Sequence, residues 1–265
     1  LFASLRCQGV DIALTNTVVT GDLTPELKAC GFRTVSLVHE LPGIIASYGI
    51  QPNAEALAAH ADAVVFPACY VADRFATVAA VPDERRIIRP QGLFDMAAVQ
   101  LDRGAAAVRL RQRLGWPSEA KVMLAVAFGD HRKGVDLFFD VARSLLTTDA
   151  DCYFLWVGDI EATMRPVVEE KLQDAMLRSH VALLPFQNDL GEFYAGADIF
   201  VLTSREDPFP CVVQEAMAAG TPVVGFEGAG GFADLLAVDD LGALAPMGDT
   251  VAMAAILRSW LHDPA

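Results

Sequence analysis

The chain has 265 residues, of which 53% are hydrophobic, so it can bury a sizeable core and is long enough for two domains. Its formal net charge of -14 excludes nucleic acid as a general partner, because neutralising phosphates needs clustered Lys and Arg. A small anionic ligand is not excluded, since it needs only local cations and a few backbone N–H groups.

The five cysteines are widely spaced without a CxxC pair, and the five histidines are scattered. This pattern indicates a reduced, cytosolic compartment, and we expect neither a metal nor a bound cofactor. No stretch approaches the roughly 18 consecutive apolar residues of a membrane span, and no signal-peptide pattern opens the sequence. Because it begins without Met in the middle of a pattern, we interpret it as lacking its first segment.

Short apolar runs alternate with helical patterns, which is typical of a parallel α/β sheet. The runs predict strands at 11–16, 34–39, 63–67, 87–90, 122–128, 153–158, 181–185, 199–203 and 222–226. The intervening segments predict helices at 54–60, 70–80, 103–114, 135–147, 166–179, 211–219 and 250–262. Gly115 and Pro117 are a helix stop, and we place a domain boundary near residue 95, giving domains 1–95 and 96–265.

In open parallel sheets, ligands bind beyond the carboxyl ends of the strands, where loops lead into helices. That rule selects the segments HELPG (39–43), GDHRKG (129–134), PFQND (185–189), SREDPFP (204–210) and EGAGG (227–231).

The loop 204–210 carries Asp207, and the helix that follows carries Glu215. Pro210 suits the first helical position, and the N–H groups of residues 211–213 would point out of the helix start toward an anion. The two acids would then flank one ligand. The alternative is that they only cap the helix, whose dipole favours such acids by about 0.3–1 kcal/mol.

Arg132 and Lys133 precede a predicted helix start, where the helix dipole disfavours cations. A bound phosphate would reverse that penalty, and solvated surface charge is the alternative reading. Gly228, Gly230 and Ala233 match a loose G-x-G-x-x-A pattern, but no acidic strand end follows about 20 residues later. We therefore expect this loop only to let backbone N–H groups approach a ligand.

Four segments in order resemble retaining glycosyltransferases of family 4 (glycosyl transferases group 1): SLVHE (36–40), RKGVD (132–136), SREDPFPCVVQEAMAAGTPVV (204–224) and GAGGFADLL (228–236). The longest is the most specific, because it is similar to the family's Glu-x7-Glu motif followed by EAMA-x-G-x-PVV. Asp207 stands at its first acidic position and Glu215 at its second. IIRPQG (87–92) resembles the strand end that closes the family's N-terminal domain.

The resemblance implies an α/β fold of the GT-B type, with two facing Rossmann-like domains built on parallel sheets. The N-terminal, acceptor-side domain would be incomplete, and the C-terminal, nucleotide-sugar-binding domain would lack the final crossover helices. The activity that it implies is metal-independent, retaining transfer of a sugar, typically a hexose, from a UDP- or GDP-linked donor to an acceptor hydroxyl.

The resemblance also implies roles for particular residues. His39 would lie near the transferred sugar, Lys133 would hold the diphosphate, and Asp207 would contact the donor sugar. Donor-binding positions would be Arg132, Lys133, Gly134, Phe186, Phe209, Pro210, Cys211, Val212, Glu215, Gly230 and Gly231, with Asp234 as the acid after the glycine loop. From its neighbours alone, a strand-end histidine such as His39 is more often structural than catalytic.

The expected partners are a nucleotide-sugar donor and a glycan or lipid-linked acceptor, without nucleic acid. The expected location is the cytoplasm, with a peripheral contact at the inner face of the membrane left open. Two other functions stay open: a nucleotide-sugar-binding module without catalysis, and a GT-B epimerase. The epimerase would not be expected to carry the 204–224 segment.

Overall fold

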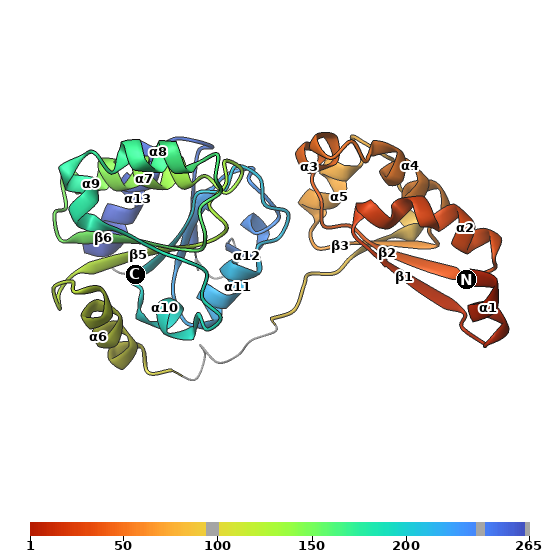
Figure 1. Cartoon of the computed structure of the whole chain (residues 1–265), viewed down its shortest axis with the longest axis horizontal. Helices are drawn as coiled ribbons and strands as arrows, with labels where there is room; N and C mark the ends of the chain where they lie inside the picture. Colours follow the sequence, from red (N-terminus) through yellow and green to blue (C-terminus); the bar gives the residue numbers. More distant parts are fainter. Residues whose placement is uncertain (94–100, 237–241, 263–265) are drawn as a thin grey trace. The chain divides into compact units, whose positions relative to one another are not determined.

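The computed structural model describes residues 1–93, 101–236 and 242–262. It divides into two compact α/β units (Figure 1), the first made of Leu1–Gly92 and Gly230–Phe232, and the second of Leu93–Ala229 and Ala233–Ala265. The chain thus passes from one unit to the other after Gly92, whereas residue 95, the expected boundary, lies outside the described residues.

The first unit is a four-stranded parallel sheet in the order β1-β2-β3-β4. Its strands are β1 (Ile12–Asn16), β2 (Arg33–Leu37), β3 (Ala63–Phe66) and β4 (Arg86–Ile88). Its helices are α1 (Phe2–Cys7), η1 (Val18–Leu23), α2 (Thr24–Ala29), α3 (Pro42–Ser47), α4 (Gln51–His60), α5 (Cys69–Phe75) and η2 (Asp83–Arg85).

Each crossover of the first unit leads to the next strand in the same direction. Right-handed crossovers of this kind put their helices on one face, and Figure 1 shows α2 to α5 on one side of the sheet. On the other face Ile12, Leu14 and Ile87 remain 54%, 64% and 44% exposed. The helices of this unit therefore cover only one face of its sheet.

The second unit is a six-stranded parallel sheet in the order β10-β9-β8-β5-β6-β7. Its strands are β5 (Lys121–Val126), β6 (Cys152–Val157), β7 (Val181–Leu184), β8 (Ile199–Leu202), β9 (Val223–Phe226) and β10 (Gly242–Ala245). Its helices are α6 (Arg103–Leu114), α7 (Val135–Leu146), α8 (Arg165–Lys171), α9 (Ala175–His180), α10 (Gly191–Gly196), α11 (Cys211–Ala218), α12 (Ala233–Leu236) and α13 (Thr250–His262).

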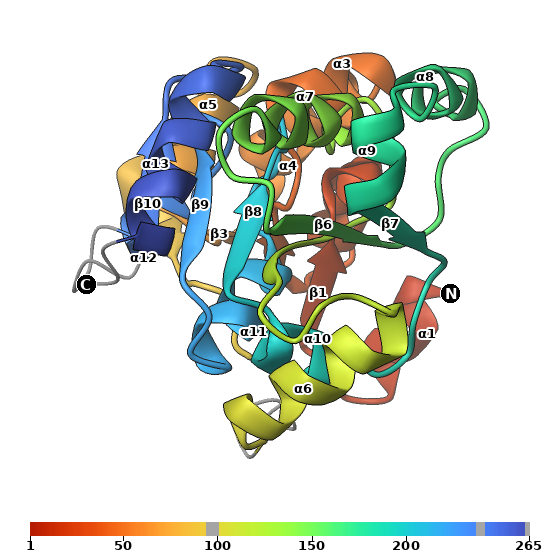
Figure 2. The same cartoon turned by 90° about the vertical axis from the view of Figure 1, so that its left-hand side faces the viewer.

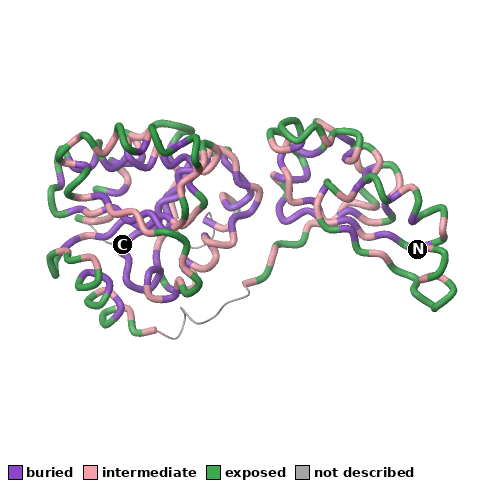
Figure 3. Tube along the Cα trace, in the orientation of Figure 1, coloured by how far each residue is buried: buried purple, intermediate pink, exposed green. Residues whose placement is uncertain are grey.

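Both faces of this second sheet are covered. Figure 2 shows α7, α8 and α9 on one face and α6, α10 and α11 on the other, and Figure 3 shows its central strands in the colour of buried residues. The core beneath α7 is aromatic, because Phe138 meets the rings of Phe154 and Trp156 of β6 edge-on, at 5.5 and 5.3 Å between centroids. This packing fixes α7, and with it the loop that connects β5 to α7.

The strand expectations are confirmed to within two residues at most ends, and Gly115 ends α6 in the left-handed region at φ 68°. One expectation is wrong: the single helix at 166–179 is two helices, α8 and α9. The chain breaks there because the Asp174 carboxylate caps α9 by accepting the N–H of Met176 at 2.9 Å. The helix expected at 70–80 also ends earlier, at Phe75.

Candidate active site

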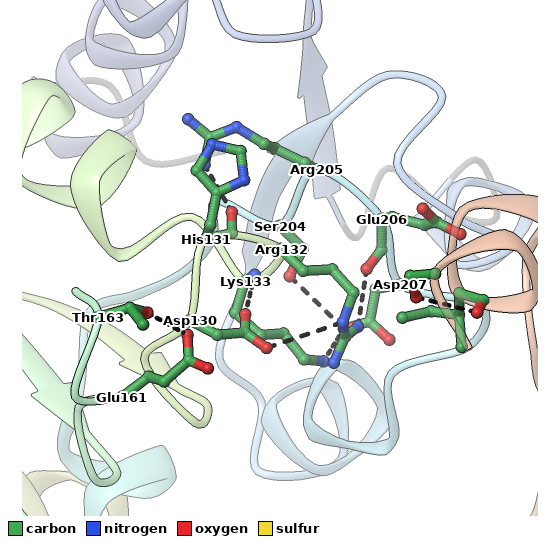
Figure 4. A network of polar contacts seen from close by, with 12 residues as sticks. Asp130, His131, Arg132, Lys133, Glu161, Thr163, Ser204, Arg205, Glu206 and Asp207 are labelled. Atoms are coloured by element: carbon green, nitrogen blue, oxygen red, sulfur yellow. Dashed lines mark hydrogen bonds and ion pairs between the residues drawn. The ribbon is translucent and has the colours of Figure 1, made fainter. Parts of the chain in front are cut away.

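The candidate site lies where the strand order of the second sheet reverses, between β5 and β8. Loops that leave the carboxyl ends of two such strands diverge to opposite faces, and a crevice opens between them. The loop after β5 carries Arg132, Lys133 and Gly134, and the loop after β8 carries Asp207. Figure 4 shows that the structure brings these predicted residues together although some 70 positions separate them in the sequence.

The two loops are joined by their backbones. Gly134 is the residue before α7, in the left-handed region at φ +72°, and a Cβ on it would lie 2.0 Å from the carbonyl oxygen of Thr203. The Thr203 hydroxyl donates to the carbonyl of Gly134 at 2.9 Å, and the Arg205 N–H donates to the carbonyl of Arg132 at 2.8 Å. Only glycine fits at position 134, which explains its place in the RKG segment.

Lys133 and Asp207 form an ion pair across the crevice, between Nζ and Oδ2. Their side chains are only 17% and 7% exposed, so little water screens the pair. The Ser204 hydroxyl lies 3.5 Å from the same carboxylate oxygen, and the Asp207 N–H donates to the carbonyl of Ala229 at 2.7 Å. The alternative that Asp207 only caps α11 is wrong, because its carboxylate binds Lys133 and the N-cap residue of α11 is Pro210.

Arg132 is held within the same loops rather than being solvated surface charge. Its Nη1 donates to the carbonyl of Glu206 at 2.8 Å, and its Nε lies 3.9 Å from a carboxylate oxygen of Asp130. The guanidinium therefore stands on the same side of the turn as the neighbouring Lys133 (Figure 4). Two cations thus lie where the loops after β5 and β8 meet.

Arg205 is a residue of this region that sequence reasoning did not single out. Its guanidinium donates to both carboxylate oxygens of Asp136 at 2.8 and 2.7 Å, and Nη1 also donates to the carbonyl of His131 at 2.7 Å. Burial alone would raise the pKa of Asp136, but the hydrogen bonds and charge of Arg205 outweigh it and lower this pKa. The pair fastens the loop after β8 to the start of α7.

A cavity of about 310 Å³ opens at the carboxyl ends of β5 and β6. Three of the predicted donor-binding residues line it, namely Phe186, Val212 and Glu215. Phe128 and Gly158 line it as well and were missed, although they are the last residues of the strands expected at 122–128 and 153–158, at the edge where ligands bind. Phe128 and Phe186 are 53% and 65% exposed, so two aromatic side chains are presented at a cavity whose lining is otherwise largely apolar.

Glu215 is oriented by Tyr194, whose hydroxyl donates to Oε2 at 2.7 Å. Burial, together with the neighbouring Glu215, raises the pKa of Tyr194, so its hydroxyl keeps the proton that it donates. Glu215 is the fifth residue of α11, so it lies inside the helix and does not cap it. Tyr194 could not have been found by spacing, because it lies in the short helix α10, which the sequence did not predict.

The start of α11 differs in detail from the expectation. Pro210 precedes the helix as its N-cap residue instead of taking the first helical position. The Val213 N–H donates to the carbonyl of Pro210 at 3.1 Å, so the prediction that this N–H is open to an anion is wrong. Phe209 is buried at the turn, and burial raises the pKa of the Cys211 thiol, which argues against a thiolate nucleophile.

The remaining predicted residues lie elsewhere. His39 follows β2 in the first unit, and Gly230 and Gly231 cluster with that unit, so their roles in donor binding stay predictions. The side chain of Asp234 lies outside the described part of the chain. Within the residues that the structure describes, His, Cys, Asp and Glu form no group of three or more suited to a metal ion, and no helix has the length and apolarity to cross a membrane.

These features define an α/β protein with parallel sheets, a cluster of polar contacts where the strand order reverses, and a cavity at the carboxyl ends of β5 and β6. The sequence profile of the family described as Glycosyl transferases group 1 matches residues 108–265, which is more than half of the chain, and the chain therefore belongs to this family. The crystal structure of Anabaena Alr3699/HepE in complex with UDP and glucose superimposes with a TM-score of 0.84 at 21% identity, covering 99% of this chain and 72% of that one. The fold is GT-B, as the sequence predicted.

Two curated relatives show the extent of the similarity. Mannosylfructose-phosphate synthase of Agrobacterium fabrum is 36% identical over 123 residues, which are 43% of this chain and 27% of that protein. D-inositol 3-phosphate glycosyltransferase 1 of Catenulispora acidiphila is 27% identical over 220 residues, which are 79% of this chain and 51% of that protein. The matches thus span between about a quarter and a half of the length of these relatives.

We expect Gly134→Ala to lower the free energy of unfolding by about 2–4 kcal/mol. The alanine would be strained in the left-handed backbone region, and its Cβ would clash with the Thr203 carbonyl oxygen. Gly248→Ala is the matched control, because its φ is +75° but nothing lies within 4 Å of the added Cβ. It should lower the free energy of unfolding by only about 1–2 kcal/mol, from the backbone strain alone. Urea denaturation measures both. Equal losses for the two variants would contradict the close approach of the two loops.

We expect Asp136→Asn to lower the free energy of unfolding at pH 7 by about 1–3 kcal/mol. Because the pKa of Asp136 is lowered in the folded state, its contribution is full above the unfolded pKa of about 3.9 and is lost as pH falls through the folded value. The variant should therefore lose less stability than the wild type between about pH 5 and pH 2. Exposed Asp151→Asn is the control, and the account fails if both variants show the wild-type acid dependence.

Proposed function

We propose that this chain forms the donor-binding and catalytic part of a retaining glycosyltransferase, which moves a sugar from a nucleotide-diphosphate sugar to an acceptor hydroxyl without a metal ion. The observation that carries the proposal is the Lys133–Asp207 ion pair in the crevice between β5 and β8, beside the cavity that Glu215 lines. Lys133 would thus supply the cation for the diphosphate, Asp207 the acid for the sugar and Glu215 the acid for the ribose.

The reaction breaks the bond between the anomeric carbon and a phosphate oxygen, so negative charge develops on the leaving diphosphate. Groups that bind this charge more strongly in the transition state than in the ground state accelerate the step. Lys133 and Arg132 supply such charge, and the positive ends of the α7 and α11 helix dipoles add to it. This is how the chain would stabilise the leaving group without a metal.

The rest of the donor has partners in the same unit. Carboxylates accept hydrogen bonds from hydroxyls, so Asp207 would bind the sugar and Glu215, oriented by Tyr194, would bind the ribose. The exposed rings of Phe128 and Phe186 would pack on the base. Support for a uridine nucleotide comes from HepE, which was solved with UDP and glucose, and a GDP-linked donor is the alternative.

In the retaining step, the acceptor oxygen forms its bond to the anomeric carbon on the face that the phosphate leaves. The acceptor hydroxyl passes its proton to an oxygen of the departing phosphate, so no protein base is required. Relatives named as a mannosylfructose-phosphate synthase and a D-inositol 3-phosphate glycosyltransferase suggest that acceptors differ widely within the family. The acceptor class proposed is therefore a glycan, a lipid or a small molecule.

The proposed location is the cytoplasm, and a lipid-linked acceptor would bring the protein to the inner face of the membrane. The wide spacing of the five cysteines, without a CxxC pair, is compatible with a reducing compartment.

Removal of Lys133 tests the proposal. Lys133→Ala leaves Asp207 as a poorly solvated carboxylate without its partner, so this variant should be less stable as well as less active. In Lys133→Ala with Asp207→Leu no unpaired charge is left, so this double variant should regain stability. Sugar transfer and donor hydrolysis should stay about 100- to 1,000-fold below wild type in both variants.

The measurement is release of UDP or GDP from a panel of sugar donors, with and without acceptors, beside thermal unfolding of each variant. Transfer at the wild-type rate by the refolded double variant would contradict the proposed role of the crevice. Stabilisation of the wild type by nucleotide sugars without any release of nucleotide would favour the alternative of a binding module without catalysis. A ligand at 100 times its dissociation constant adds about 2.7 kcal/mol of stability, which this measurement detects.

A further inference from the structure

The imidazole of His39 is hydrogen-bonded at both ring nitrogens by side chains of the first unit. Its Nε2 lies 2.9 Å from Oδ1 of Asn16, and its Nδ1 lies 2.8 Å from Nε2 of Gln91. Asn16 ends β1, His39 follows β2, and Gln91 follows β4, so three segments meet at the carboxyl edge of this parallel sheet. No local sequence pattern joins them.

The two partners together select one protonation state. An amide nitrogen only donates, so the Nδ1 atom facing Gln91 must accept and carries no proton. In a neutral imidazole the proton is then on Nε2, which donates to the amide oxygen of Asn16. A proton on Nδ1 would instead place two donors against each other. The two contacts therefore agree on the neutral tautomer protonated at Nε2.

The backbone of the same loop is also fixed. Oε2 of Glu40 accepts the N–H of His39 at 3.0 Å and the N–H of Val18 at 3.1 Å, and the N–H of Thr17 donates to the carbonyl of Leu37 at 3.0 Å. These bonds connect the loop after β2 to the segment after β1. The position of the ring is therefore set by the main chain, and its orientation by the two amides.

We propose that Asn16 and Gln91 are positioning residues, which hold His39 as the neutral tautomer protonated at Nε2 and in one orientation for sugar transfer. The proposal rests on the proposed function, since His39 affects a rate only if the protein is a transferase. With its lone pair on Nδ1 and its proton on Nε2 both engaged by the protein, His39 does not serve as the base that receives the acceptor proton. That agrees with a reaction in which the leaving phosphate takes the proton.

The test compares two substitutions of an amide by an acid, which should have opposite results. Gln91→Glu turns the donor at Nδ1 into an acceptor, so His39 should move its proton to Nδ1 or become doubly protonated. Asn16→Asp keeps an acceptor at Nε2, so Nδ1 should stay unprotonated. Long-range ¹H–¹⁵N NMR spectra of the histidine rings at pH 8 report the state of each nitrogen, with His39 assigned from a His39→Gln variant.

Sugar transfer is measured on the same variants. Gln91→Glu should lower kcat about tenfold or more, because a group that takes part in the reaction loses much of its effect when it is misplaced. Exposed Gln8→Glu, the matched control, should change neither the spectrum nor the rate. The inference is overturned if wild-type His39 carries its proton on Nδ1 or shows the averaged signals of a free imidazole. It is also overturned if Gln91→Glu alters the spectrum but not kcat.

Failure of the proposed function would look different. If the wild type transferred no sugar from any donor, the proposed function would fail, while the spectra of the wild type and of the two amide variants would still decide the tautomer. A His39 signal that follows the expected pattern in all three would then leave the positioning contacts in place without a sugar-transfer role, which overturns the inference as stated.

Discussion

The contact between Gly134 and the carbonyl of Thr203 is the constraint on which the candidate site depends. At this point the loops after β5 and β8 approach more closely than any residue with a Cβ allows. The approach lets the Arg205 N–H reach the carbonyl of Arg132, and it places Lys133 opposite Asp207. The site is therefore fixed by the backbone of two strands at the reversal of the sheet, and its side chains need little further ordering on binding.

The charges of the site would allow an acidic chain to hold an anion. The net charge is -14, yet Arg132 and Lys133 lie together where the loops after β5 and β8 meet. The Arg205 guanidinium forms a bidentate ion pair with Asp136, so its charge is neutralised within the fold. Lys133 instead pairs with Asp207, and both side chains are largely shielded from water. Asp207 thus keeps the ammonium ordered before the donor arrives. A diphosphate would share Lys133 with Asp207, and the acid would then be available to a sugar hydroxyl.

Much of this arrangement could be predicted from the sequence, and the failures have physical reasons. The strands with apolar runs and the helices with a clear amphipathic pattern were found, because their signals extend over many residues. Among the elements that were missed are the helix α10 and the strand β10, since GEFYAG is short with glycine at both ends and GALA consists of small residues.

The contacts between distant segments were beyond a sequence pattern. The family motif pointed to Lys133, Asp207 and Glu215, but nothing in the spacing connects Asp136 with Arg205 or Glu215 with Tyr194, because these pairs meet only through the order of the strands. The same holds for Asn16 and Gln91 on either side of His39. Motifs therefore identified the groups that would touch the donor, and the fold was needed to find those that orient them.

The central claim is that the crevice between β5 and β8 binds the diphosphate of a nucleotide sugar. A crystal structure of the protein with UDP tests it most directly. The account predicts diphosphate oxygens about 2.7–3.2 Å from Nζ of Lys133 and a ribose hydroxyl at the same distance from the carboxylate of Glu215. UDP bound instead in the neighbouring groove of about 320 Å³ beside Arg165, with the Lys133–Asp207 pair untouched, would contradict it.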